Sequence, residues 1–215
     1  MDSLLGKKIG MTQLYDDKGT VMPVTVLRVG PCYVLRVISN EKDGYYALQI
    51  GFEERKNKGI NRAELKFFEK IGIKPQRFIR EVRIDREELS KYKPGDLLDV
   101  ELFNGAIYVD VQGNSIGKGF QGGMKRWNWK GGPKTHGSMS HRRPGSIGSS
   151  TDPSRVFKGQ HMPGRMGNSR ITVKNLKVIF RDKEKNLLVV KGAVPGPGNN
   201  LVLVRKSRKQ PKIKK

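Results

Sequence analysis

Two histidines stand close to groups that could act as nucleophile, acid and base. His136 and His141 flank Ser138, while Lys134 precedes them and Asp152 follows. Hydrolases and nucleases need such groups, but they hold them in a rigid pocket. The surrounding sequence has too few apolar residues to build one. We therefore interpret both histidines as polar contacts to a binding partner, by ring stacking or hydrogen bonding. An enzyme that processes this partner is the alternative, and its turnover would be lost on changing either histidine.

Cofactor and metal chemistry find little support in the sequence. Residues 117–122 match G-x-G-x-x-G, but a dinucleotide site also needs a following helix and an acid about 20 residues further on. The next residues, WNWKGGP, leave little room for a helix, and no acid lies between Gly122 and Asp152. One cysteine, Cys32, and three scattered histidines make a poor metal-ligand set. We predict no catalytic residue, cofactor, metal or small-molecule substrate.

The positive charge is large and local. The chain has 43 Lys and Arg against 20 Asp and Glu, a net charge of +23. Residues 1–112 are nearly balanced, whereas 113–170 hold 11 cations and one anion, and 205–215 hold seven cations and no anion. Dispersed cations favour a polyanionic partner, because neutralising phosphates releases counterions. No run of about 18 apolar residues predicts a membrane span, and no apolar h-region begins the chain. We expect a cytoplasmic nucleic-acid-binding protein.

Residues 113–170 differ from the rest of the chain. They contain 13 glycines but only three aliphatic residues of the Ile, Val or Leu type, so they cannot build a core of their own. They also contain both tryptophans, which are usually depleted from disordered segments. We predict a long extension that packs against its binding partner instead of forming a core of its own. Trp127 and Trp129 would share one face of an extended chain, where they either stack on RNA or dock the extension onto the folded core.

The candidate RNA contacts are the cations of this segment together with its tryptophans and two histidines: Lys118, Lys125, Arg126, Trp127, Trp129, Lys130, Lys134, His136, His141, Arg142, Arg143, Arg155, Lys158, Arg165 and Arg170.

The remainder predicts a mainly β fold. Short apolar runs, among them CYVLRVIS and YYALQIGFEE, are separated by turn signals. These signals are Asp17-Lys18-Gly19, Asp43-Gly44 and Asn104-Gly105, the last being the strongest hairpin signal. Seven or eight such strands favour an antiparallel closed β-barrel. Asn61 and Glu64 are typical of a helix start, and predict a small helical insertion near residues 58–74. The predicted order is barrel strands in 1–112, the extended loop in 113–170, closing strands in 171–204 and a basic tail in 205–215.

Three stretches carry a resemblance to a known family. They are GKKIGMTQLYDDKG at the start, GKGFQGGMKRWNWKGGPKTHGSMSHRRPGSIG in the middle, and VFKGQHMPGRMGNSRITVKNLKV after it. Together they resemble the bacterial members of the ribosomal protein L-three family over nearly the whole chain. The resemblance implies a β-barrel of the translation-protein type, with a central loop that runs through large-subunit (23S-type) rRNA towards the peptidyl transferase centre. It also implies early binding to rRNA, neighbouring large-subunit proteins as partners, and a place in the ribosome.

The resemblance places the loop tip at Gly148, Ser149, Ser150, Thr151 and Asp152, followed by Pro153. Many bacterial members carry a methylated glutamine near this tip. No glutamine lies between Gly148 and Pro153 here, so that modification is not expected. Gln160 and His161 stand where family members often have two basic residues. The alternative to a ribosomal component is a free RNA chaperone or translation factor with the same barrel, which predicts reversible binding and a soluble pool.

Overall fold

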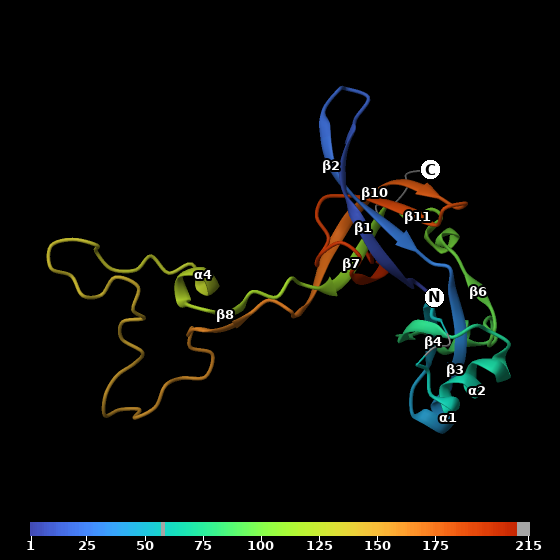
Figure 1. Cartoon of the computed structure of the whole chain (residues 1–215), viewed down its shortest axis with the longest axis horizontal. Helices are drawn as coiled ribbons and strands as arrows, with labels where there is room; N and C mark the ends of the chain where they lie inside the picture. Colours follow the sequence, from blue (N-terminus) through green and yellow to red (C-terminus); the bar gives the residue numbers. More distant parts are fainter. Residues whose placement is uncertain (57–58, 210–215) are drawn as a thin grey trace. The chain divides into compact units, whose positions relative to one another are not determined.

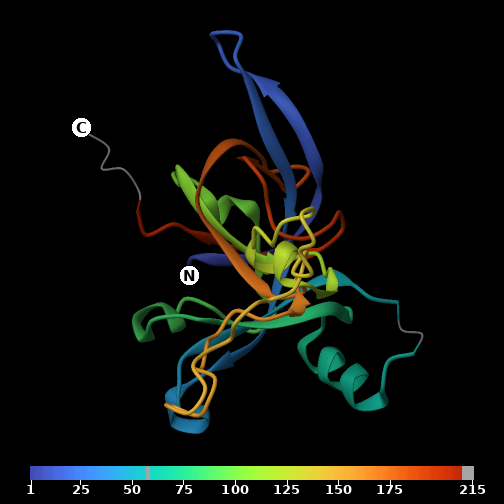
Figure 2. The ribbon, with the colours of Figure 1, turned by 90° about the vertical axis from the view of Figure 1, so that its left-hand side faces the viewer.

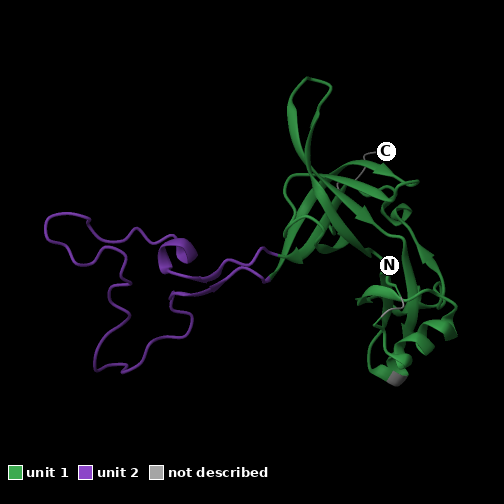
Figure 3. Ribbon diagram, viewed as in Figure 1, with its two compact units in different colours: residues 1–114, 170–215 green, residues 115–169 purple. Residues whose placement is uncertain are grey.

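The computed structural model describes residues 1–56 and 59–209, and it is mainly β with a few short helices (Figure 1). Two compact units make up the chain (Figure 3). The first contains Met1–Asn114 and Arg170–Lys215, and the second contains Ser115–Ser169. The predicted helical insertion begins at Lys58 and the predicted basic tail ends at 210–215, and these residues lie outside the described part.

The first unit contains a ring of six antiparallel strands. Around the ring they run β1, β12, β7, β10, β11 and β2, and β2 pairs with β1 again. Apolar side chains alternate along these strands, and the inward set is fully buried, as at Val109 and Val111 of β7. The strands are β1 (Ser3–Tyr15), β2 (Val21–Val29), β7 (Tyr108–Asn114), β10 (Arg170–Asp182), β11 (Leu187–Lys191) and β12 (Leu201–Lys206).

A second sheet in the same unit has the order β5, β4, β3, β6. Its strands are β3 (Cys32–Ile38), β4 (Ala47–Glu54), β5 (Gln76–Arg83) and β6 (Leu97–Leu98). The sequence analysis counted β3 and β4 among the barrel strands, but they pair with β5 and β6 instead. Alternation shows which face of a strand is buried, but not which strand it pairs with. One apolar core nevertheless continues from the ring into this sheet.

Three helices accompany the second sheet: α1 (Asn40–Asp43), α2 (Arg62–Ile71) and α3 (Arg86–Leu89). The predicted helix therefore exists, and it begins after Asn61 as expected. The Asn61 side chain makes no capping hydrogen bond, so this detail of the prediction is wrong. The helix ends at Gly72, whose φ of 77° is the left-handed conformation in which glycine is favoured. It buries Phe68, while its cations stay exposed.

The turn signals had different outcomes. The Asp17-Lys18-Gly19 turn joins β1 and β2 as a hairpin, seen in blue in Figure 2, which confirms that prediction. The Asn104-Gly105 hairpin is wrong. A 3-10 helix, η1 (Val100–Phe103), precedes this turn and buries Val100 and Phe103, three residues apart. Asn104 has φ −60° and Gly105 has φ 75°, whereas a type I′ hairpin needs positive φ at both.

Cys32 lies in the core, fully buried at the start of β3. Its Sγ atom lies 3.5 Å from the carbonyl oxygen of Leu5, to which the thiol donates a weak hydrogen bond. Burial raises the pKa of the Cys32 thiol to about 12, because a thiolate there would lose its hydration. This side chain therefore acts as a small apolar residue of the core.

Candidate nucleic-acid interface

The second unit begins and ends as a narrow two-stranded ribbon. β8 (Gly119–Gln121) pairs antiparallel with β9 (Gly164–Met166). The pairing continues through the Ser115 amide, which donates to the carbonyl of Ser169 at 2.9 Å, and the Lys118 amide, which donates to that of Met166 at 2.9 Å. The ribbon is the element that holds the two ends of the extension together.

The glycine motif at 117–122 lies within this ribbon. β8 occupies its centre and pairs antiparallel, so the motif is not the first turn of a parallel β-α-β unit. A helix does follow, α4 (Gly123–Trp127), where the sequence analysis saw little room for one. It has five residues and ends at Asn128, whose φ is 59°. The antiparallel pairing of β8 therefore rules out a dinucleotide-binding turn at this motif, a reason that the sequence alone did not show.

A cluster around Trp127 ties α4 to the returning chain. Trp127 stacks on His161 with ring centroids 4.0 Å apart and planes 5° from parallel. Its indole nitrogen donates to the Met162 carbonyl at 2.9 Å, and the Arg126 guanidinium donates to the same oxygen at 2.6 Å. The Arg126 guanidinium also lies 4.9 Å from the Trp127 ring centroid. Arg126 is consequently half-buried, unlike the other candidate cations of the extension.

Trp129 packs within the extension as well. A Cβ atom on Gly123 would lie 2.0 Å from its ring, so a larger residue cannot occupy this buried position without displacing the indole. Trp129 also lines a hollow of about 330 Å³ together with Ile147, Gln160 and His161. These contacts give both tryptophans an internal role, besides the two that the sequence suggested. Trp127 keeps 38% of its surface exposed.

The other candidate cations are exposed. In the described part of the chain, none of the extension's cations lies within 4.0 Å of a carboxylate oxygen. Arg170 lies in the first unit, where it opens β10 and pairs with Asn114. The exposed cations of the extension are Lys118, Lys125, Lys130, Lys134, Arg142, Arg143, Arg155, Lys158 and Arg165.

His136 and His141 are both exposed, and both lie outside the helices and strands of the extension. His136 is exposed with φ 56°, and the carbonyl oxygen of His141 accepts from the Gly132 amide at 2.9 Å. Within the described residues, no three His, Cys, Asp or Glu side chains gather where they could hold a metal ion. What the arrangement offers is exposed charge and polar side chains on a backbone with many glycines.

Two aromatic residues that the sequence analysis did not single out also face solvent. Phe120 is 76% exposed in β8, and Phe157 is 59% exposed with the Arg155 guanidinium 5.2 Å from its ring centroid. Exposed rings beside cations suit base or sugar stacking. An aromatic residue inside a basic segment without a core was the signal that could have identified them.

The predicted tip, Gly148–Asp152, is exposed and has no cation. The Ser146 hydroxyl donates to the Gly148 carbonyl at 3.2 Å, and the Ser154 hydroxyl donates to the Thr151 carbonyl. These bonds are local, so the tip is shaped by its own turn.

The chain thus combines a mainly β unit with a cationic, glycine-rich extension. The model of the family "Ribosomal protein L3" matches residues 79–186. Large ribosomal subunit protein uL3 of Heliobacterium modesticaldum is 50% identical over 206 residues, covering 96% of this chain and 97% of the relative. That of Thermotoga petrophila is 48% identical over 212 residues, covering 99% and 100%. The chain belongs to the ribosomal protein L3 family, as the resemblance predicted. No helix in the described residues is long and apolar enough to cross a membrane.

Proposed function

We propose that this chain is a structural constituent of the large ribosomal subunit that binds large-subunit (23S-type) rRNA through its extension. The observation that carries the proposal is the set of nine exposed, unpaired cations on the described extension. Family membership supports it, since the relatives are large-subunit proteins. The family is structural rather than enzymatic, and this supports a structural role for the chain.

The mechanism is electrostatic and architectural. Each exposed cation neutralises a phosphate, so that rRNA segments which would repel one another can pack closely. Duplex RNA hides its base edges in a deep, narrow groove, so shape and backbone contacts dominate over base reading. The Trp127 cluster fixes the start of the extension, and the exposed rings of Phe120 and Phe157 supply stacking surfaces. We infer that such binding supports early subunit assembly.

The tip has a separate role in this proposal. Residues 148–152 have one charge, that of Asp152, so they add little to the attraction for phosphates. By resemblance to the family, we place them near the peptidyl transferase centre, where they support rRNA. We also propose that the six-stranded ring is the closed barrel of the translation-protein type, that neighbouring large-subunit proteins contact it, and that the protein resides in cytoplasmic ribosomes.

Crosslinking in cells, followed by mapping of the attached RNA positions, tests the proposal. We expect crosslinks from the extension to 23S-type rRNA, and co-sedimentation of the protein with large subunits after a high-salt wash. A largely soluble pool that leaves the subunits in high salt would favour the free chaperone or translation factor. Crosslinks confined to other RNAs would contradict a ribosomal role.

A further inference from the structure

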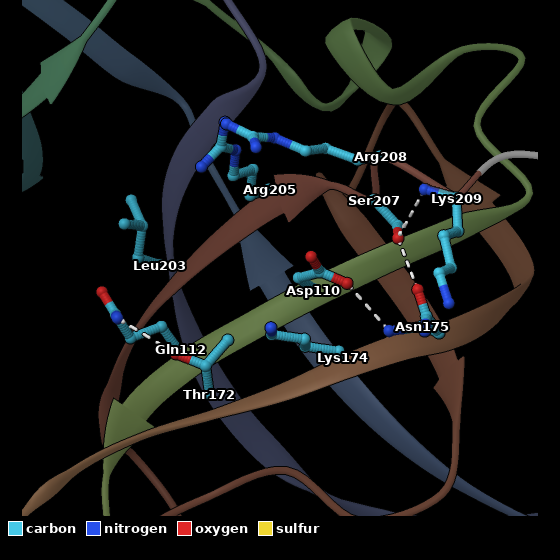
Figure 4. A pocket seen from close by; sticks show the side chains of 10 residues that line it. All are labelled: Asp110, Gln112, Thr172, Lys174, Asn175, Leu203, Arg205, Ser207, Arg208 and Lys209. Carbon is cyan, nitrogen blue, oxygen red and sulfur yellow. Dashed lines mark hydrogen bonds between the residues drawn. The ribbon is translucent and has the colours of Figure 1, made fainter.

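The outer face of the ring has a polar hollow of about 590 Å³, distinct from the extension (Figure 4). It lies over three adjacent strands, with β7 in the middle and β10 and β12 on either side. Val109 and Val111 of β7 point into the core, so Asp110 and Gln112 between and after them point outward. The sheet therefore fixes the floor of the hollow.

Strand register arranges this floor in two rows. Gln112 is paired with Leu203 on one side and Thr172 on the other, and its side-chain amide donates to the Thr172 hydroxyl at 3.1 Å. In the next row, Asp110 is paired with Arg205. On the other side of Asp110, a bulge in β10 brings Lys174 and Asn175 to the hollow.

The end of the described chain forms one wall. After β12, the Ser207 side chain is buried, and its hydroxyl donates to the Asn175 side-chain oxygen at 2.6 Å. The Asn175 amide donates to the Asp110 carboxylate at 2.8 Å. This chain of hydrogen bonds, visible in Figure 4, fixes the segment that presents Arg208 and Lys209. The wall is thus positioned by hydrogen bonds to the strands of the floor.

Four cations line the hollow against a single carboxylate. They are Lys174, Arg205, Arg208 and Lys209, and all four are exposed. Within residues 1–56 and 59–209, none of them lies within 4.0 Å of a carboxylate oxygen. In Figure 4, Arg205 and Arg208 lie at one end of the hollow, and Lys209 lies at the other. Cations spread along a groove suit a ligand with repeated negative charges rather than one small anion.

We propose that this hollow is a second RNA-binding site, which holds a stretch of sugar-phosphate backbone against the ring. Arg205 and Arg208 bind one phosphate, Lys174 and Lys209 bind its neighbours, and the row Leu203–Gln112–Thr172 contacts the sugar side. Guanidinium groups suit phosphate because they donate paired hydrogen bonds. The inference rests on the proposed RNA partner, but it makes the ring an RNA-binding surface in its own right. The sequence favoured phosphate contact for the basic run 205–215, which includes Arg205, Arg208 and Lys209, but it did not indicate Lys174.

Salt-dependent binding of full-length protein to a 23S-type rRNA transcript tests the site. The variant Lys174→Gln, Arg205→Gln, Arg208→Gln removes the contacts to two phosphates, so we expect the log–log salt slope to fall by about 1.4 units and the affinity by about 25-fold near 0.1 M salt. The matched control, Arg62→Gln with Lys66→Gln and Lys70→Gln, neutralises three exposed cations of α2 and leaves the slope unchanged. An unchanged slope in the triple variant overturns the second site. If a variant with the cations of the extension neutralised loses binding to the transcript while the triple variant keeps its slope, the proposed function stands and only the second site fails.

Lysine acetylation read by mass spectrometry provides an independent measurement. Bound rRNA transcript should slow acetylation of Lys174 and Lys209, whereas Lys66 and Lys70 should react as in the free protein. Equal reactivity of Lys174 with and without rRNA refutes the site. Protection that appears only in intact large subunits, and not with the transcript alone, also refutes it and assigns the hollow to an acidic protein partner.

Discussion

Neutralising Arg142 and Arg143 should weaken rRNA binding by a predictable amount. Both side chains are exposed, and neither has a carboxylate within ion-pair distance among the described residues. The Arg143 amide donates to the Ser140 carbonyl at 2.8 Å, a backbone bond that the substitutions Arg142→Gln and Arg143→Gln preserve. The change therefore removes two charges while keeping the local turn.

The size of the effect follows from counterion release. Each phosphate contact to single-stranded RNA contributes about 0.7 to the log–log salt slope, so two lost contacts reduce it by about 1.4. Relative to 1 M salt, that is about a 25-fold loss of affinity near 0.1 M, or about 1.9 kcal/mol. Reversal to Glu at both positions should weaken binding further, because repulsion is then added.

Filter binding or fluorescence anisotropy with a 23S-type rRNA transcript, at several salt concentrations, measures the slope directly. Circular dichroism and a thermal melt of each variant show whether the fold is kept. The variant Lys66→Gln with Lys70→Gln controls for the loss of two charges elsewhere. If the arginine variant is folded and its slope equals that of the control, these arginines do not contact phosphates and the reasoning fails.

Three further predictions concern the tip, the extension and the core. Deleting Ser149–Asp152 should leave the sedimentation profiles of the subunits nearly normal but alter peptide release or drug inhibition on purified ribosomes. If subunits fail to assemble, the tip is an assembly element, and if neither readout changes, it is only a turn. Amides of the ribbon at 115–121 and 164–169 should resist hydrogen exchange more than those of 133–160 in RNA-free protein, and uniform protection would contradict this. Cys32 should react with thiol reagents at pH 8 only after the first unit unfolds locally, because a pKa of about 12 leaves about one thiol in ten thousand as the thiolate. Rapid labelling of the folded protein would show that the thiol is accessible.

Local sequence signals predicted the strands and turns of the first unit better than they predicted which strands pair with one another. Asp17-Lys18-Gly19 defined its hairpin because β1 and β2 are neighbours in both sequence and space. The Asn104-Gly105 signal failed because burial of Phe103 favoured a 3-10 turn over a strand. The strand at Cys32–Ile38 was recognised, but its membership of a separate sheet depends on distant pairing that alternation does not encode.

The extension was recognisable from charge and glycine content, whereas its internal contacts were not. Trp127 meets His161 and Met162 across 34 and 35 positions of sequence without helical or strand periodicity, so no pattern predicted the cluster. Its cations were identified because exposure follows from composition in a segment that lacks apolar residues. Which phosphate each of them meets depends on the RNA, and those assignments remain predictions.

The closing of the ring also constrains the order of folding. β1 pairs with β12 from Ser3–Arg205 to Lys7–Leu201, so the first strand cannot complete its pairing until residues 201–205 have been synthesised. β7 likewise waits for β10, because the whole extension is made between them. Pairings so distant in sequence form slowly. During synthesis the basic extension therefore leaves the translating ribosome while the ring is still open, and nascent chains can meet polyanions before their β core is complete.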